Sequence, residues 1–155
     1  MKLNFKKILI FALFLIIYFL PSLIFRQDNE FYTSLKGNFV PPIIFIIAWA
    51  IIFLCLAFVN SYYIYHRKDY DQREVKHYFI LVIINYILIF LFPLAFFVMH
   101  NLFFSYIVTL LTCMTSILLA MQSLLLKKKL TYLYLPYILW TMFATVYSIM
   151  LYLQN

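Results

Sequence analysis

The stretch that decides the fold is Tyr78–Leu126, which reads YFILVIINYILIFLFPLAFFVMHNLFFSYIVTLLTCMTSILLAMQSLLL. Its 49 residues contain no Lys, Arg, Asp or Glu. As one straight α-helix it would exceed about 70 Å, more than twice the hydrocarbon core of a bilayer, which is roughly 30 Å thick. The chain must therefore fold back, and His100-Asn101 is the polar pair near the middle. We predict two membrane-spanning helices here, at about 78–98 and 102–126.

Three more apolar runs predict further spans. The N-terminal run is free of charge over 18 residues, just long enough as a helix to cross the hydrocarbon core. The second run includes Pro41-Pro42, and proline favours the first turn of a helix, where its missing N–H has no intrahelical partner to lose. With a last run near the C-terminus, the three spans fall at about 8–25, 41–65 and 131–153.

The composition agrees with a membrane bundle. Of the 155 residues, 67% are hydrophobic, 22% aromatic and 11% charged, whereas an average soluble domain has roughly 45–50% apolar and about 25% charged residues. This excludes a soluble enzyme, a disordered chain and a disulfide-stapled secreted domain. The weak alternation of polar and apolar residues argues against a β-barrel. We predict an all-α membrane protein whose residues 1–155 form a single domain of five transmembrane helices.

The basic residues predict the orientation. With five spans, ten of the twelve Lys and Arg fall on one side: Lys2, Lys6, Lys7, Arg67, Lys68, Arg73, Lys76, Lys127, Lys128 and Lys129. The other side has Arg26 and Lys36. Cytoplasmic loops carry the excess of positive charge, so we expect the N-terminus inside and the C-terminus outside. We expect the first span to be retained, because no small-residue cleavage site follows it. The dispersed charge does not indicate nucleic-acid binding.

The sequence offers no set of side chains for ordinary catalysis or metal binding. The three histidines lie in loops without the spacing of metal ligands, and no nucleophile or carboxylate stands beside them in a catalytic arrangement. All five acidic residues are also in loops, whereas an ion-coupled pump would normally have a carboxylate within a span. Cys55 and Cys113 fall inside spans and are expected to be free thiols. We predict no metal site.

Aromatic residues within the spans suggest a ligand pocket. Trp49 and Trp140 lie near mid-bilayer, although tryptophan usually marks the membrane interface. They either fill space between helices or line a pocket. Asn85, early in the third span, either bonds to a neighbouring helix or contributes to that pocket. The apolar outer loop 26–40 is suited to cover the bundle mouth, and we call it the lid.

Two motifs resemble those of the TspO/MBR family, the tryptophan-rich sensory proteins that include the mitochondrial translocator protein. Residues 31–42 read FYTSLKGNFVPP and are followed by Trp49, similar to the family's W-Y-x-x-L-x-K-P-x-W-x-P-P…W run. Residues 135–145 read LPYILWTMFAT, which closely resembles P-Y-x-x-W-x-x-F-A. Asn85 matches the family's third-span asparagine. Phe31 and Phe39 stand where the family has lid tryptophans, so the chain looks like a divergent member.

The resemblance implies a homodimeric five-helix bundle that binds a porphyrin, such as protoporphyrin IX or haem, under the lid. No other cofactor is required. The expected ligand-binding residues are Tyr32, Pro42, Trp49, Phe53, Asn85, Trp140, Phe143 and Ala144. The first expectation is a receptor or sensor, with a passive carrier or channel as an alternative.

A second alternative is an enzyme. Some family members are thought to promote light- and oxygen-dependent porphyrin breakdown, in which Trp49 and Trp140 would be the catalytic pair. Sterol binding is not expected, because no Lys or Arg follows Lys129. The charge asymmetry and the lack of a mitochondrial presequence favour a bacterial cytoplasmic membrane.

Overall fold

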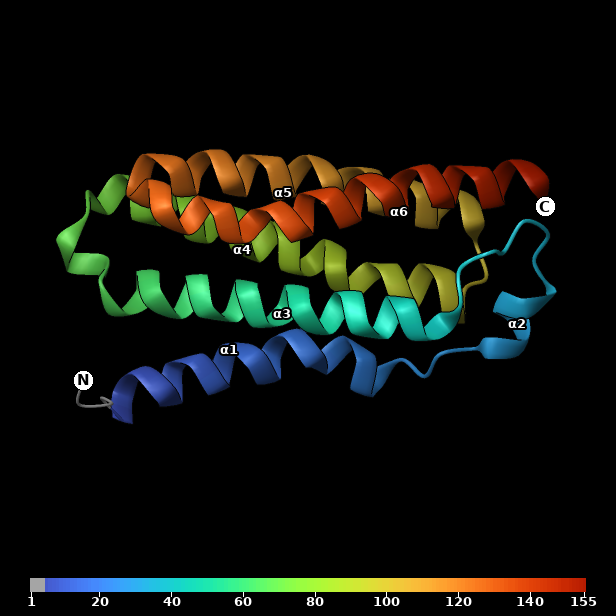
Figure 1. Cartoon of the computed structure of the whole chain (residues 1–155), viewed down its shortest axis with the longest axis horizontal. Coiled ribbons are helices and arrows are strands. Elements are labelled where there is room, and N and C mark those ends of the chain that lie inside the picture. Colours follow the sequence, from blue (N-terminus) through green and yellow to red (C-terminus); the bar gives the residue numbers. More distant parts are fainter. Residues whose placement is uncertain (1–4) are drawn as a thin grey trace.

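The computed structural model describes residues 5–155, and over this range the chain forms helices and connecting turns without a strand. Five long helices lie side by side along the long axis of the molecule (Figure 1). The α-helices are α1 (Phe5–Ile24), α2 (Asn29–Ser34), α3 (Pro42–Tyr65), α4 (Gln72–Pro93), α5 (Leu102–Thr131) and α6 (Leu135–Gln154). Short helical turns are η1 (Arg67–Asp69), η2 (Leu94–Val98) and η3 (Tyr132–Tyr134). The all-α prediction is confirmed.

Four helical stretches are long and apolar enough to cross a membrane: Phe5–Ile24, Pro42–Tyr65, Gln72–Val98 and Leu102–Gln154. The last contains 53 residues, about 80 Å if it were straight. It is not straight, because Lys127 has non-helical backbone angles (φ −156°, ψ 99°) and α6 folds back along α5 (Figure 1).

The start and the end of α4 both follow from the local sequence. The Asp71 side chain accepts a hydrogen bond from the Arg73 N–H at 2.7 Å, so α4 begins before the apolar run itself. At the other end of α4, Pro93 lacks an N–H, which removes one helical hydrogen bond. The next five residues form the π-helical turn η2, in which the Met99 N–H donates to the Leu94 carbonyl at 2.9 Å.

Buried polar side chains fasten the half of the bundle farther from the lid. Asn60, on α3, donates from Nδ2 to the Tyr18 hydroxyl at 2.6 Å and accepts from the Tyr78 hydroxyl. The Tyr78 and Tyr134 hydroxyl oxygens lie 2.6 Å apart. All four side chains are buried. Because lipid offers no partner for such groups, these bonds fix α1, α3, α4 and η3 relative to one another.

Candidate functional site

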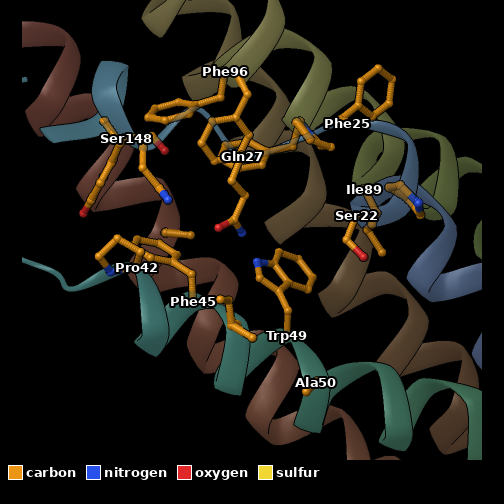
Figure 2. A pocket seen from close by; sticks show the side chains of 18 of the residues that line it. Ser22, Phe25, Gln27, Pro42, Phe45, Trp49, Ala50, Ile89, Phe96 and Ser148 are labelled. Carbon is orange, nitrogen blue, oxygen red and sulfur yellow. The ribbon is translucent and has the colours of Figure 1, made fainter. Parts of the chain in front are cut away.

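A cavity of about 180 Å³ lies beneath the lid, between α1, α3, α4 and α6 (Figure 2). Ten aromatic side chains line it: Phe19, Phe25, Tyr32, Phe45, Trp49, Phe53, Phe92, Phe96, Phe97 and Tyr147. Besides the Tyr32 and Tyr147 hydroxyls, the amide and hydroxyl side chains in the wall are Ser22, Gln27, Asn29 and Ser148. No charged side chain is among the described residues that form the wall. The cavity is therefore suited to a flat, largely apolar ligand.

The structure brings five of the eight predicted ligand-binding residues to this wall: Tyr32, Pro42, Trp49, Phe53 and Ala144. The other three, Asn85, Trp140 and Phe143, lie outside it.

One face of α3 supplies the floor of the cavity. Phe45, Trp49 and Phe53 follow one another at intervals of four residues, so their side chains share that face. The Trp49 and Phe53 rings are 5.2 Å apart, and Phe53 stacks on Tyr18 of α1 at 5.6 Å. These contacts hold the Trp49 indole toward the cavity (Figure 2).

Asn85 links helices instead of lining the cavity. Its Oδ1 accepts from the Tyr137 hydroxyl at 3.0 Å, and its Nδ2 donates to the Thr115 hydroxyl at 2.7 Å. Asn85 is 1% exposed, so both ends of its amide are satisfied inside the bundle. Of the two interpretations of this residue, the interhelical hydrogen bond describes the observed geometry.

Trp140 lies behind the cavity wall, where its ring packs edge-to-face on Phe45 at 5.5 Å. Its Nε1–H is buried and has no acceptor among the described residues. Phe143 is 37% exposed and lies 5.4 Å from the Trp140 ring and 5.8 Å from the Tyr147 ring, on which it stacks. Trp140 and Phe143 thus form a layer outside the cavity.

A buried tyrosine pair fastens the lid over the cavity. The Tyr32 hydroxyl donates to the Val40 carbonyl at 2.6 Å, and the Tyr147 hydroxyl of α6 lies 2.6 Å from it. Burial, followed by the contact with Tyr147, raises the pKa of Tyr32 above its ordinary value. The Tyr32 phenol therefore stays protonated and keeps its bond to the Val40 carbonyl.

A second contact joins the lid to the end of α6. The Asn155 side chain accepts from the Lys36 N–H at 2.9 Å and donates to the Lys36 carbonyl at 3.1 Å. Beside it, Gly37 has a positive φ of 76°, and a Cβ there would lie 1.8 Å from Oε1 of Gln154. A side chain at this position would require a strained backbone and a shift of the flexible Gln154 side chain, which favours the chain's single glycine there.

A third contact comes from the turn after η2. The Phe31 ring stacks on the His100 ring at 4.0 Å, and His100 Nε2 lies 3.2 Å from Asp28 Oδ2. Asp28 also caps α2 by accepting from the Phe31 N–H at 2.9 Å. His100 has a positive φ of 48°, uncommon for a residue other than glycine. The lid is therefore held at both ends and in the middle.

Several cavity residues escaped the sequence reasoning. Phe45 could have been found, because it precedes Trp49 by one helical turn. Phe92 and Phe96 stack on each other at 5.6 Å across the junction of α4 and η2. Their spacing of four residues could have paired them, but a helix that is apolar on all sides does not show which face turns toward a cavity. Gln27 belongs to the lid, and Figure 2 shows its amide extending into the cavity toward Trp49. A polar residue in a loop gives no signal for such a position.

The wall side chains suggest binding rather than proton transfer. Within the range 5–155 no group of three His, Cys, Asp or Glu could hold a metal ion. The wall has aromatic faces, two tyrosine hydroxyls and a few amide and hydroxyl groups, none of which is an ordinary acid or base at neutral pH. The Trp49 ring is oxidisable, so light-driven oxidation is open to this site when a light-absorbing ligand and dioxygen are both supplied.

Comparison with known proteins places this arrangement in context. The family model described as "TspO/MBR family" matches residues 8–153 of this chain. The chain is 32% identical over 152 residues to a tryptophan-rich protein TspO of Bacillus cereus, covering 97% of each chain. It is also 32% identical over 142 residues to an uncharacterized membrane protein, YtaB, of Bacillus subtilis, covering 88% of this chain and 90% of that one.

Proposed function

The chain belongs to the TspO/MBR family and is a multi-pass membrane protein, and we propose that it is a receptor or sensor that binds a porphyrin-like tetrapyrrole such as protoporphyrin IX beneath the lid. The observation that carries the proposal is the cavity wall of ten aromatic rings without a charged side chain. A flat, conjugated macrocycle can stack on such rings, each good aromatic contact contributing about 0.5–1.5 kcal/mol beyond area burial.

Polar groups beside the lid give the ligand a preferred orientation. Gln27 and Asn29 contribute amides to the wall, and the Trp49 indole adds a donor opposite Gln27 (Figure 2). Farther from the lid, the wall includes the apolar side chains of Ala50, Phe53 and Ile89. We therefore expect the polar substituents of the macrocycle to face the lid and its apolar edge to lie against Phe53.

Two features favour a receptor over a carrier. The lid is fastened to α6 by Tyr32 and Asn155. Beyond the cavity, the hydrogen-bonded group of Tyr18, Asn60 and Tyr78 is buried and joins three helices. Passage of a macrocycle through the bundle would break these bonds without replacing them. The ligand would therefore enter and leave on the same side.

The light-dependent enzyme is the second candidate, and the position of Trp49 favours it. Its indole lies in the cavity wall, so it would contact a bound porphyrin directly. An illuminated porphyrin transfers energy to dioxygen, and the excited (singlet) dioxygen that results oxidises nearby indoles. Measuring porphyrin loss under light, with and without oxygen, separates binding alone from binding followed by breakdown. The measurement compares the unmodified protein with Trp49→Phe.

For the topology we propose five crossings, with the N-terminus inside and the C-terminus outside. The N-terminal and C-terminal ends of the described chain lie at opposite ends of the bundle (Figure 1), which fits an odd number of crossings. Lys2 falls outside the described residues, but the lysines of the 127–129 turn lie at the end opposite the lid. Tags placed at Asn155 and before α1 test this: the first should be reachable from outside intact cells and the second should not.

A matched pair of variants on α3 tests the ligand site. Phe53 lines the cavity, whereas Phe58 is 49% exposed on the outer surface of the same helix. Loss of one stacking ring in Phe53→Leu should weaken saturable binding of protoporphyrin IX by about two- to tenfold. Phe58→Leu should leave the affinity unchanged. Equal affinities for the two variants, or absorbance that rises linearly without saturation, would refute the proposed site.

A further inference from the structure

Phe45 separates the cavity from Trp140. Its ring belongs to the cavity wall and packs edge-to-face on the Trp140 ring at an interplanar angle of 75°. Trp140 does not line the cavity, although Ala144, one helical turn later on α6, does. The Phe45 ring also lies 5.9 Å from the Tyr32 ring and 6.0 Å from the Tyr147 ring. One side chain of α3 thus closes this part of the wall.

The Trp140 indole lacks a hydrogen-bond partner in this closed arrangement. Its Nε1 is buried, and no acceptor contacts it in the described part of the chain. Leaving a buried donor unsatisfied is costly, so native structures rarely keep one without a reason. An apolar groove lies on the outer side of the indole, lined by Ala48, Ile51, Ile52, Pro136 and Leu139. The groove gives the ring room to shift but offers no side-chain acceptor.

The cavity is also small for a macrocycle. Its volume of about 180 Å³ lies below the roughly 300–1,000 Å³ of typical ligand pockets. A tetrapyrrole must therefore displace part of the wall. The contacts of Tyr32 and Tyr147 are hydrogen bonds, whereas Phe45 is held by ring contacts alone. Displacing the Phe45 ring breaks no hydrogen bond, so the site can widen there without leaving a polar group unpaired.

We propose that Phe45 sets the size limit of the ligand site and controls whether the ligand reaches Trp140. This inference rests on the proposed tetrapyrrole function. A ligand wider than the cavity displaces the Phe45 ring, after which the Trp140 indole joins the wall and donates its Nε1–H to a peripheral oxygen of the macrocycle. The ligand class is a planar macrocycle bearing carbonyl or carboxylate groups. A small planar aromatic compound occupies the cavity without moving Phe45 and does not contact Trp140.

Nuclear magnetic resonance of the two indole N–H groups tests the contact. The unmodified protein, labelled with ¹⁵N and held in lipid nanodiscs, is titrated with protoporphyrin IX and separately with quinoline. Trp49→Phe serves only to assign the Trp140 signal. Protoporphyrin IX should shift the Trp140 signal strongly, through the ring current and the new hydrogen bond, whereas quinoline should shift only the Trp49 signal. A Trp140 signal that stays in place while porphyrin absorbance shows saturable binding overturns the role of Phe45.

Association kinetics test the displacement step. Phe45→Leu replaces the ring by a smaller side chain, and Phe58→Leu makes the same change on the outer surface of the same helix, away from the cavity. Protoporphyrin IX should associate about fivefold faster with Phe45→Leu and at an unchanged rate with Phe58→Leu. Equal rates in the two variants contradict the inference. Absence of saturable binding to the unmodified protein contradicts the proposed function itself, and the inference with it.

Discussion

Removal of one oxygen atom from the lid provides a quantitative test of how the cavity is closed. Tyr32→Phe keeps the aromatic ring in the cavity wall but removes the hydroxyl that bonds to the Val40 carbonyl and to the Tyr147 hydroxyl, each at 2.6 Å. Tyr32, Val40 and Tyr147 are 6%, 7% and 4% exposed, so water cannot readily replace the lost partner.

The expected magnitude follows from these two bonds. A typical intramolecular hydrogen bond contributes about 0.5–1.5 kcal/mol net, so the two together contribute about 1–3 kcal/mol to the closed lid. Because about 1.4 kcal/mol corresponds to a factor of ten, the open population should rise by about 5- to 150-fold. Tyr147→Phe removes only one of the two bonds, so its expected effect is about 2- to 12-fold.

Hydrogen–deuterium exchange of the lid amides, measured by mass spectrometry in nanodiscs, reports the open population directly. Exchange should increase in the order unmodified protein, Tyr147→Phe, Tyr32→Phe. The amides of α5 serve as the internal control and should not change. Exchange in Tyr32→Phe within twofold of the unmodified protein, or equal to that in Tyr147→Phe, would refute the account of the lid.

Three further predictions concern the lid and the bundle. Gly37→Ala should loosen the lid by about 1–2 kcal/mol, seen as faster lid exchange, because alanine disfavours the positive φ. Its Cβ meets only the flexible end of the Gln154 side chain, so adding Gln154→Ala should rescue little of the effect. Asn60→Leu should lower the stability by about 1–3 kcal/mol and the midpoint of thermal unfolding by several degrees, because Tyr18 and Tyr78 lose a buried partner. The raised pKa of Tyr32 means that its contribution is present below about pH 10, the ordinary tyrosine value, and is lost as the pH rises through the raised value. The difference in lid opening between the unmodified protein and Tyr32→Phe, corrected for intrinsic exchange, should therefore be constant between about pH 6 and pH 9.

The helical class of the protein was predictable because it depends on a one-dimensional property. Uncharged runs such as Tyr78–Leu126 are incompatible with a soluble fold, and a single run of that length has to fold back. The family was predictable from two local motifs, and the match over residues 8–153 confirms it. Neither prediction required knowledge of which way a side chain faces.

The cavity wall was harder to predict because the helices are apolar on all sides. In a soluble helix, the polar face shows which side chains point inward. Phe45 and Trp140 both lie on apolar helices without such a marker. Their depth in the membrane could be predicted from the sequence, but the direction in which each side chain points around the helix axis could not. The structure places Phe45 in the wall and Trp140 behind it. The π-helical turn η2 also changes the direction in which the side chains after Pro93 point around the helix axis.

The most direct test of the central claim is to find where a bound porphyrin damages the protein under light. The protein in nanodiscs, with one equivalent of protoporphyrin IX, is illuminated briefly in oxygen, and its oxidised residues are identified by mass spectrometry. Trp49 lines the cavity, whereas Met114 and Met121 are 55% and 59% exposed on the outer surface of α5. A porphyrin in the cavity should oxidise Trp49 first and leave the two methionines intact. Early oxidation of Met114 and Met121 with Trp49 spared would place the porphyrin in the lipid and contradict the account.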